Sequence, residues 1–227
     1  MENLTELEPE PVSALIERLP KYFTMSFASK RNSGKTYLVT DIVKTLLKKK
    51  KVDMVLVMSN SAGLNNDYAF LPEGLIMPFK ESVLEQLWKR QKNTPREKRE
   101  HILVVLDDVL SDPQAVRSHN VGRLYALGRH NFISCIVISQ VANHVLSPVM
   151  KQNSDFILWS RLNKNQLGIL WESMNGVEKR DFVRWAETFG GVHFNFCVFD
   201  NYTDAVRPED FLMVIRSSRQ KPEEFLS

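Results

Sequence analysis

The sequence predicts an α/β fold with a mainly parallel central sheet, helices on both faces and antiparallel strands at the C-terminal end. Strand-like and helical segments alternate along most of the 227 residues, which is typical of a layered sheet with right-handed crossovers. Residues 102–106 and, apart from Ser134, residues 133–138 are continuously apolar, as expected of central parallel strands that are covered on both faces. The β-rich stretch at 192–217 predicts the antiparallel addition.

The first half of the chain begins with a strand, a tight loop and a helix. Residues 22–28 alternate apolar and small side chains as a strand does, and the apolar residues of 35–48 recur at helical spacing. The remaining elements of this half are a strand at 53–59, a loop with the short apolar piece 75–77, a helix at 82–91 and a strand at 101–108.

The second half continues the alternation and then changes to strands. A helix is expected at 114–127, and Pro148 is expected to open or interrupt a short helix that ends near Gln152, because proline suits the first turn of a helix but not its interior. The other expected elements are strands at 133–139 and 156–160, helices at 165–174 and 177–188, and strands within 192–201 and 211–217.

The chain shows no internal repeat or interdomain linker. Residues 1–20 are expected to be a flexible acidic leader, and residues 21–227 a single domain of a size that can bury one good core. The N-terminus lacks the layout of a signal peptide, and no apolar run approaches the roughly 20 residues of a membrane span. Cys135 and Cys197 each lie in an apolar run, which favours buried free thiols over a disulfide or metal site and predicts an intracellular protein.

Charge is unevenly distributed although the formal net charge is only +3. The segments 44–51 and 89–99 are both basic. Such segments are either solvated helix ends and loops, where lysines also suit the helix dipole, or a surface that faces a polyanion. The sequence leaves both interpretations open.

The Ser-Gly-Lys-Thr at 33–36 lies between a predicted strand and a predicted helix, where a phosphate-binding loop would lie. A loop that turns backbone N–H groups inward at a helix N-terminus can hold a phosphate chain. Lys35 would place its ammonium between the β- and γ-phosphates, and the Thr36 hydroxyl would ligate Mg²⁺. The candidate nucleotide-binding residues are Ser29, Lys30, Arg31, Asn32, Ser33, Gly34, Lys35 and Thr36.

This loop departs from the usual pattern G-x-x-x-x-G-K-[ST] at its first position, where Ser29 replaces glycine. Glycine there permits an unusual backbone angle, so serine predicts either a tolerable turn or some strain. Lys30 and Arg31 add two cations, which can neutralise phosphate or point outward to another polyanion.

Two carboxylates follow the buried strand "HILVVLDD", at the strand edge where open α/β sheets bind ligands. In a phosphate-loop enzyme the first, Asp107, would hold Mg²⁺ through its water shell, and the second, Asp108, would orient and deprotonate the attacking water. Aspartate at the second position is one methylene shorter than the usual glutamate. A lone pair of this kind is also compatible with a strand-end turn or a helix cap, but together with the upstream loop it predicts an NTPase.

The next strand and the segment before it supply two further candidates. Gln140 follows strand 133–139 and could hydrogen-bond the γ-phosphate or the attacking water, or it could be an ordinary loop glutamine. Arg129 is badly placed for the phosphates of its own chain but could reach those of a neighbour, where such an arginine accelerates hydrolysis. A surface or fold-stabilising role is the alternative for Arg129, and more so for Arg123. His130 is taken as structural.

The series "SGKT", "VVLDD", "LGRHNFIS" and "ISQ…LSPVMKQNSDFILWSR" resembles the poxvirus-type genome-packaging ATPases of large DNA viruses, virophages and related transposons. These belong to the FtsK–HerA superfamily of DNA-pumping motors. The resemblance runs from the first strand through Arg161, and its most specific part is Gly128–His130 with Ile133, Ser134 and Gln140.

The resemblance implies a RecA-like additional-strand ATPase core that uses ATP and Mg²⁺. It also implies a homo-oligomeric ring, pentameric or hexameric, that translocates double-stranded DNA into a preformed capsid, with a capsid or portal-vertex protein as partner. The location would then be the host cytoplasm or virus factory, with association with the virion as a further possibility. It maps nucleotide binding onto Ser33–Thr36, metal binding and water activation onto Asp107 and Asp108, and γ-phosphate sensing onto Gln140.

Two other functions remain compatible with the motifs. The first is a nucleotide-dependent scaffold at a capsid vertex with little turnover, which the short Asp108 side chain favours slightly. The second is a P-loop kinase, although paired carboxylates favour water as the nucleophile and no lid segment is evident.

Overall fold

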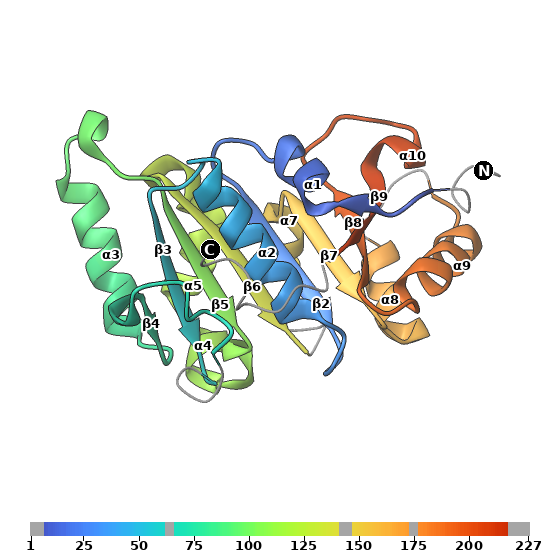
Figure 1. The fold of residues 1–227 in the computed structure, drawn as a ribbon, viewed down its shortest axis with the longest axis horizontal. Coiled ribbons are helices and arrows are strands. Elements are labelled where there is room, and N and C mark those ends of the chain that lie inside the picture. The colour runs from blue at the N-terminus through green and yellow to red at the C-terminus, as the bar shows by residue number, and fades with distance from the viewer. Residues whose placement is uncertain (1–6, 62–65, 141–146, 173–176, 218–227) are drawn as a thin grey trace.

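A single nine-stranded sheet runs through the computed structural model, which describes residues 7–61, 66–140, 147–172 and 177–217 (Figure 1). The strand order is β1-β9-β8-β7-β2-β6-β5-β3-β4. The strands are β1 (Glu10–Pro11), β2 (Thr24–Ser29), β3 (Met54–Ser59), β4 (Ile76–Met77), β5 (Ile102–Asp107), β6 (Ile133–Ser139), β7 (Phe156–Ser160), β8 (Asn195–Asp200) and β9 (Leu212–Arg216).

The sheet is parallel from β7 through β4, and only the pairs β7–β8 and β8–β9 are antiparallel. The predicted fold class is therefore confirmed, including the antiparallel strands at the C-terminal end. β6 lies between β2 and β5, so the sheet contains the additional strand that the family resemblance implies.

Helices cover both faces of the sheet (Figure 1). α1 and α2 pack on one face, and α3, α5, α7, α8 and α9 pack on the other. The helices are α1 (Val12–Arg18), α2 (Lys35–Lys48), α3 (Glu81–Asn93), α4 (Pro113–Arg117), α5 (His119–Leu127), α7 (Pro148–Asn153), α8 (Lys164–Trp171), α9 (Lys179–Gly190) and α10 (Pro208–Phe211), and the 3₁₀ turns are η2 (Glu73–Leu75), η3 (Arg96–Lys98), η4 (Val109–Ser111) and η5 (Arg129–Asn131).

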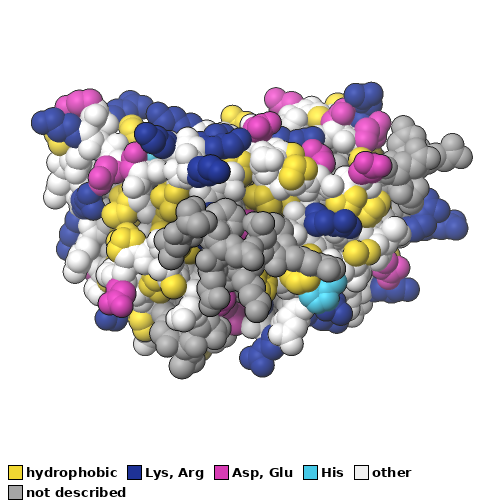
Figure 2. Space-filling view, in the orientation of Figure 1, with side chains coloured by type: hydrophobic (Ala, Val, Ile, Leu, Met, Phe, Trp, Pro, Cys, Tyr) yellow, Lys and Arg dark blue, Asp and Glu magenta, His cyan; other side chains and the backbone are white. Residues whose placement is uncertain are grey.

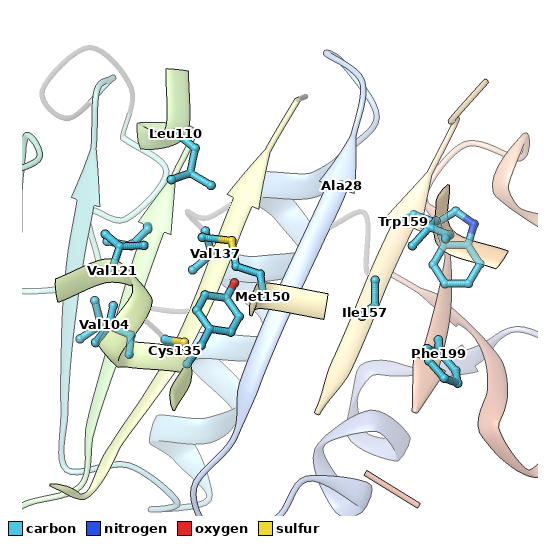
Figure 3. Close-up of a cluster of buried hydrophobic side chains, with 14 of the residues drawn as sticks. Ala28, Val104, Leu110, Val121, Cys135, Val137, Met150, Ile157, Trp159 and Phe199 are labelled. Carbon is cyan, nitrogen blue, oxygen red and sulfur yellow. The ribbon is translucent and has the colours of Figure 1, made fainter. Parts of the chain in front are cut away.

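Each central strand contributes to two cores because successive side chains point to opposite faces. In β5, Leu103 and Val105 join the core under α2, whereas Val104 joins the core under α5. Figure 3 shows the second core, where Val137 of β6 and Met150 of α7 lie on the same face. This double burial is the reason that most residues of β5 and β6 are apolar on both faces.

The helix expected at 114–127 is two helices, so that expectation is wrong. Ser118 has an extended backbone, with φ −64° and ψ 119°, and its side chain accepts a hydrogen bond from the Val121 N–H, which makes it the N-cap of α5. Asp112 caps α4 in the same way through the Gln114 N–H. Two side chains that cap helices therefore divide the segment.

The leader expected to be flexible over residues 1–20 forms regular structure over 10–18. Glu10 and Pro11 pair with the end of β9, and α1 buries Leu15 and Ile16 against α2. The prediction relied on the acidic composition of the first residues and missed the apolar face of α1. Burial of this face favours the folded, packed state. Residues 1–6 lie outside the described part of the chain, as do residues 173 and 174 of the helix expected at 165–174.

The two edges of the parallel sheet differ in chemistry. The carboxyl ends of β2, β5 and β6 point downward in Figure 1 and carry the candidate site residues. The amino ends lie at the upper edge, where Figure 2 shows many lysine and arginine side chains. Part of the basic segment 89–99 has a structural role, since Arg90 forms an ion pair with Glu100, and Arg99 donates to the Thr94 carbonyl at 2.9 Å.

Candidate functional site

The predicted phosphate loop connects β2 to α2 at the carboxyl edge of the sheet. Ser29 is the last residue of β2, Gly34 is the N-cap of α2, and Lys35 is the first helical residue. Asn32 and Gly34 have left-handed backbones, with φ of 55° and 88°. The turn therefore falls on these two residues, and the N–H groups of the first turn of α2 belong to a helix N-terminus, which favours anions.

Serine at position 29 is accommodated without a left-handed backbone. Ser29 continues the strand pairing with Ser160 and is not among the residues with positive φ. Its hydroxyl is fully buried and donates to the Ser33 hydroxyl across the loop. The structure thus supports the tolerable turn, and the Ser29–Ser33 hydrogen bond closes the loop where the usual motif has glycine.

Gly34 has a second reason to be glycine. An ideal Cβ built on it would lie 2.8 Å from Cδ1 of Phe194, which is closer than side-chain packing tolerates. The chain thus approaches itself closely at the point where the phosphate loop turns into the helix, and φ of 88° already disfavours other residues there.

Lys35 and Asp107 lie at the same edge and interact electrostatically. The pKa of Asp107 is raised to about 6, mainly by burial and to a smaller extent by Asp108 and Asp67, whereas the hydrogen bond from Tyr68 and the positive charge of Lys35 oppose this rise. The Tyr68 hydroxyl donates to Asp107 Oδ2 at 2.9 Å. Lys35 is itself buried, with 9% of its surface exposed. The loop cation and the strand carboxylate therefore face one site.

The pKa of Asp107 predicts how the site depends on pH. Because folding raises this pKa above its ordinary 3.8, the folded protein holds the proton more tightly, and Asp107 lowers the stability as pH rises from about 4 to about 6. Metal binding needs the ionised carboxylate, so Mg²⁺-dependent affinity for an ATP analogue should fall as pH drops through about 6.

Tyr68→Phe removes the hydrogen bond that favours the ionised form of Asp107, and we expect the midpoint of this pH profile to rise by about one unit. Calorimetric titrations at several pH values would measure the midpoint. Tyr202→Phe is the matched control, because Tyr202 is 56% exposed. An unchanged midpoint in Tyr68→Phe would contradict the assignment of Tyr68.

Asp108, Gln140 and Arg31 form a chain of hydrogen bonds next to Asp107. The Gln140 amide Nε2 donates to Asp108 Oδ2, and Arg31 Nε donates to Gln140 Oε1 at 2.9 Å. Asp108 directly follows β5 and has φ of 58°, a left-handed backbone conformation of the kind that occurs at functional sites. The phosphate loop, the second carboxylate and the polar residue after β6 are thus connected directly.

Arg129 lies elsewhere in its own chain. It begins η5, immediately before the amino end of β6. Burial raises the pKa of Asp155, just before β7, and the charge of Arg129 partly offsets this rise. This is the edge opposite the phosphate loop, so the fold separates Arg129 from the other candidates. Arg123 has a structural role, because its guanidinium lies 4.4 Å from the centre of the Trp88 ring and donates to Asn120 Oδ1 at 3.1 Å.

Two residues near the site were not predicted from the sequence. Tyr68 comes from the loop after β3 and reaches Asp107 only through the fold. Arg161, which follows β7, has φ of 55° and donates to the Asn32 carbonyl at 3.4 Å. The sequence could have identified Arg161 as a site candidate, because it directly follows a central strand and such positions line the edge of the sheet where ligands bind.

The donor set fits ATP and Mg²⁺. Magnesium sites in this kind of chemistry use one or two protein oxygens together with phosphates and water, and Thr36 and Asp107 supply a hydroxyl and a carboxylate at one edge. Among the described residues no group of three or more His, Cys, Asp or Glu side chains could hold a metal ion. Protein ligands alone therefore do not form a metal cage in this part of the chain.

Structural comparison identifies proteins with the same fold. The genome packaging NTPase B204 from Sulfolobus turreted icosahedral virus 2, in complex with AMPPCP, aligns over 88% of this chain and 100% of its own with a TM-score of 0.61 and 14% identity. B204 from Sulfolobus turreted icosahedral virus, described as its DNA-packaging ATPase, aligns over 88% and 98% with a TM-score of 0.62 and 13% identity. The pCW3 conjugation coupling protein TcpA with ATPγS aligns over 87% and 60% with a TM-score of 0.60 and 15% identity.

Sequence comparison identifies the family. No curated protein matches the chain. Separately, no helix of the described residues has the length and apolar character needed to cross a membrane. The model of one family, described as Poxvirus A32 protein, matches residues 16–193. This match covers well over half of the chain and includes the phosphate loop, both carboxylates and Gln140, so the chain belongs to the poxvirus A32 protein family.

Proposed function

We propose that the chain hydrolyses ATP at this site and, as a homo-oligomeric ring, uses the reaction to move double-stranded DNA into a viral capsid. One observation carries the proposal: Lys35 and Asp107 face each other at one sheet edge, with the hydrogen-bonded chain from Arg31 to Asp108 beside them. Family membership and the fold shared with packaging NTPases support the same conclusion.

ATP would be held mainly by the loop of residues 29–36. The backbone N–H groups at the start of α2 and the Lys35 ammonium bind the phosphates, and Lys30 and Arg31 add positive charge on the exposed side of the loop. Thr36 and Asp107 would hold Mg²⁺, which when bound neutralises charge that develops on the β- and γ-phosphate oxygens.

Asp108 would accept the proton of the attacking water. Gln140 would orient that water, and its hydrogen bond to the Asp108 carboxylate supports this role. Arg31 belongs to the phosphate loop and holds the other end of the Gln140 amide. A change of charge at the γ-phosphate would thus affect Gln140 through the Arg31 side chain alone, as expected of a residue that senses hydrolysis.

The ring, the DNA and the capsid partner enter through the family. Arg129 would act on the phosphates of the neighbouring subunit, since it lies far from those of its own. Exposed basic residues such as those of 89–99 would contact the DNA backbone, and a capsid or portal-vertex protein would hold the ring in place during packaging in the infected cell. Contacts with phosphates are independent of base sequence and weaken with salt.

The test measures phosphate release and oligomer mass with and without duplex DNA. We expect an oligomer whose ATP hydrolysis is stimulated by DNA and whose stimulation falls as salt is raised. Asp108→Asn should lower turnover by about 10²–10⁴-fold, the usual contribution of a general base, with ATP affinity retained. Asp108→Glu keeps a carboxylate and should retain measurable turnover.

Two outcomes would overturn the proposal in different ways. Tight ATP binding without turnover, even with DNA and capsid protein, would identify a nucleotide-dependent scaffold. Transfer of phosphate to an acceptor without release of free phosphate would identify a P-loop kinase.

A further inference from the structure

Three aromatic side chains gather beside Gly34 on the side of the phosphate loop that faces away from Asp107. Phe194 directly precedes β8, and in the sheet β8 and β5 lie on opposite sides of β2. The Phe194 ring reaches the position that a Cβ of Gly34 would occupy. Tyr37 is the residue after Thr36, in the first turn of α2. The aromatic cluster of Tyr37, His193 and Phe194 is therefore part of the wall of the phosphate loop.

The rings of this cluster have the geometry of a stacking surface. The centroids of His193 and Phe194 are 4.3 Å apart with an angle of 35° between the planes, and Tyr37 meets Phe194 edge to face at 6.2 Å. Tyr37 is 41% exposed and His193 is also exposed. These rings lie next to a ligand loop and are partly exposed, so they offer a surface on which another flat ring can stack.

The backbone holds Phe194 in an unfavourable conformation. Its φ is 64°, a left-handed value that is a true outlier for a bulky residue and is energetically unfavourable. Two backbone hydrogen bonds hold the segment, from the Ser217 N–H to the Phe194 carbonyl at 3.1 Å and from the Asn195 N–H to the Val192 carbonyl at 3.2 Å. Such strain is found at ligand clamps, where the surrounding structure maintains it.

Space for a nucleoside adjoins the cluster. A groove of about 1490 Å³ lies beside α2, and its lining includes His193, Phe194 and Arg216 together with Asp41 and Lys44 of α2. Ligand pockets commonly measure 300–1,000 Å³, so the groove that His193 and Phe194 line has room for a base and its sugar.

We propose that Tyr37, His193 and Phe194 form the subsite that binds the base of the nucleoside triphosphate, by stacking on its flat face. The proposal rests on the proposed function, in which residues 29–36 hold the phosphates. The nucleoside end of the triphosphate then leaves the loop away from Asp107, toward the cluster. Stacking reads the face of a base and not its hydrogen-bonding edge, so the subsite accepts purines in general and separates ATP from GTP only weakly.

The experiment compares ATP with inorganic tripolyphosphate, which carries the phosphates but no base. Calorimetric affinities, with Mg²⁺ present, are measured for the full chain and for Tyr37→Ala/His193→Ala, two exposed positions whose truncation should spare the fold. Phe194→Leu is a second variant that keeps apolar bulk against Gly34. Val192→Ala is the matched control, since Val192 is 45% exposed, adjoins the cluster and has no ring.

We expect the natural chain to bind ATP more tightly than tripolyphosphate. The double variant should bind ATP about 5- to 150-fold more weakly, as removal of a stacking partner does, with its tripolyphosphate affinity and melting temperature unchanged. Phe194→Leu should also weaken ATP binding and leave the tripolyphosphate affinity unchanged. Val192→Ala should change neither the ATP affinity nor the tripolyphosphate affinity.

Failure of this inference is distinct from failure of the proposed function. If the natural chain binds both ligands but the double variant loses nothing, or loses both equally, the base subsite is overturned and the phosphate site stands. If the natural chain binds neither ligand, the proposed function is wrong and the base subsite is rejected with it.

Discussion

Replacing Lys35 by alanine is expected to lower kcat/KM for ATP by about 10³–10⁵-fold. Two losses combine in this estimate. A charge-assisted hydrogen bond to phosphate in the ground state is worth about 10–100-fold in affinity, and a preorganised donor to charge that develops in the transition state is worth about 10²–10³-fold in rate. The geometry supports both, because Lys35 is buried at the start of α2 and its charge already reaches Asp107.

The measurement separates binding from turnover with an ATP analogue and steady-state phosphate release. Lys48→Ala is the matched control, because Lys48 is a lysine of the same helix at its other end. Removal of Lys35 also removes a charge that lowers the pKa of Asp107, so the variant should be assayed above pH 7, where that carboxylate stays ionised. A variant with near-normal kcat/KM would show that the loop does not hold the triphosphate.

Arg129→Ala is expected to lower turnover by about 10³–10⁵-fold, the range observed for arginines supplied by a neighbour, with ATP binding by each subunit preserved. The physical reason is distance. Arg129 precedes β6 and the phosphate loop follows β2, and because β2 and β6 are parallel these two points lie at opposite edges of the sheet. An effect of Arg129 on hydrolysis would then have to be exerted on an adjacent subunit.

A mixing experiment makes this prediction specific. Lys35→Ala subunits carry an intact Arg129 and a defective loop, whereas Arg129→Ala subunits carry the reverse. Mixed assemblies should recover part of the turnover that each variant lacks alone. Arg117→Ala, an exposed position on α4, is the control. Full turnover by Arg129→Ala in a normal assembly, or no recovery on mixing, would exclude the trans role.

Melting temperatures must accompany these assays, because Arg129 also has a neighbour in its own chain. Burial raises the pKa of Asp155 and the charge of Arg129 partly offsets this rise. Asp155 Oδ2 also accepts hydrogen bonds from the Thr24 N–H at 2.7 Å and the Thr24 hydroxyl at 2.9 Å. Loss of folding would appear as a lower melting temperature and as loss of ATP binding, neither of which the trans role predicts.

Local pattern was sufficient for most of the fold. The helix at 35–48 and the strands at 133–139 and 156–160 occur at the predicted residues, because hydrophobic periodicity and burial act on neighbouring positions. Where prediction failed, the interactions of a few particular side chains determined the structure. Ser118 divided a helix by capping its second half, and the apolar face of α1 overrode the acidic composition of the N-terminus.

The sequence also predicted which residues gather at the candidate site, because the carboxyl ends of parallel strands share one edge. Asp107, Asp108 and Gln140 follow from that rule once β5 and β6 are recognised. Their roles in catalysis remain predictions. The rule could not find Tyr68, which comes from an irregular loop without a periodic signal, nor the hydrogen bond from Arg31 to Gln140, which joins residues 109 positions apart.

The sequence by itself determined the fold class and the candidate residues of the phosphate loop, of the end of β5 and of the position after β6. These depend on residue type, spacing and the burial of neighbouring positions. The tertiary structure alone decided that Tyr68 supports Asp107, that Arg129 lies at the far edge, and that Phe194 closes against Gly34. Each of these depends on where distant segments meet in space, and that is set by packing of the whole sheet and its helices and not by any short stretch of the chain.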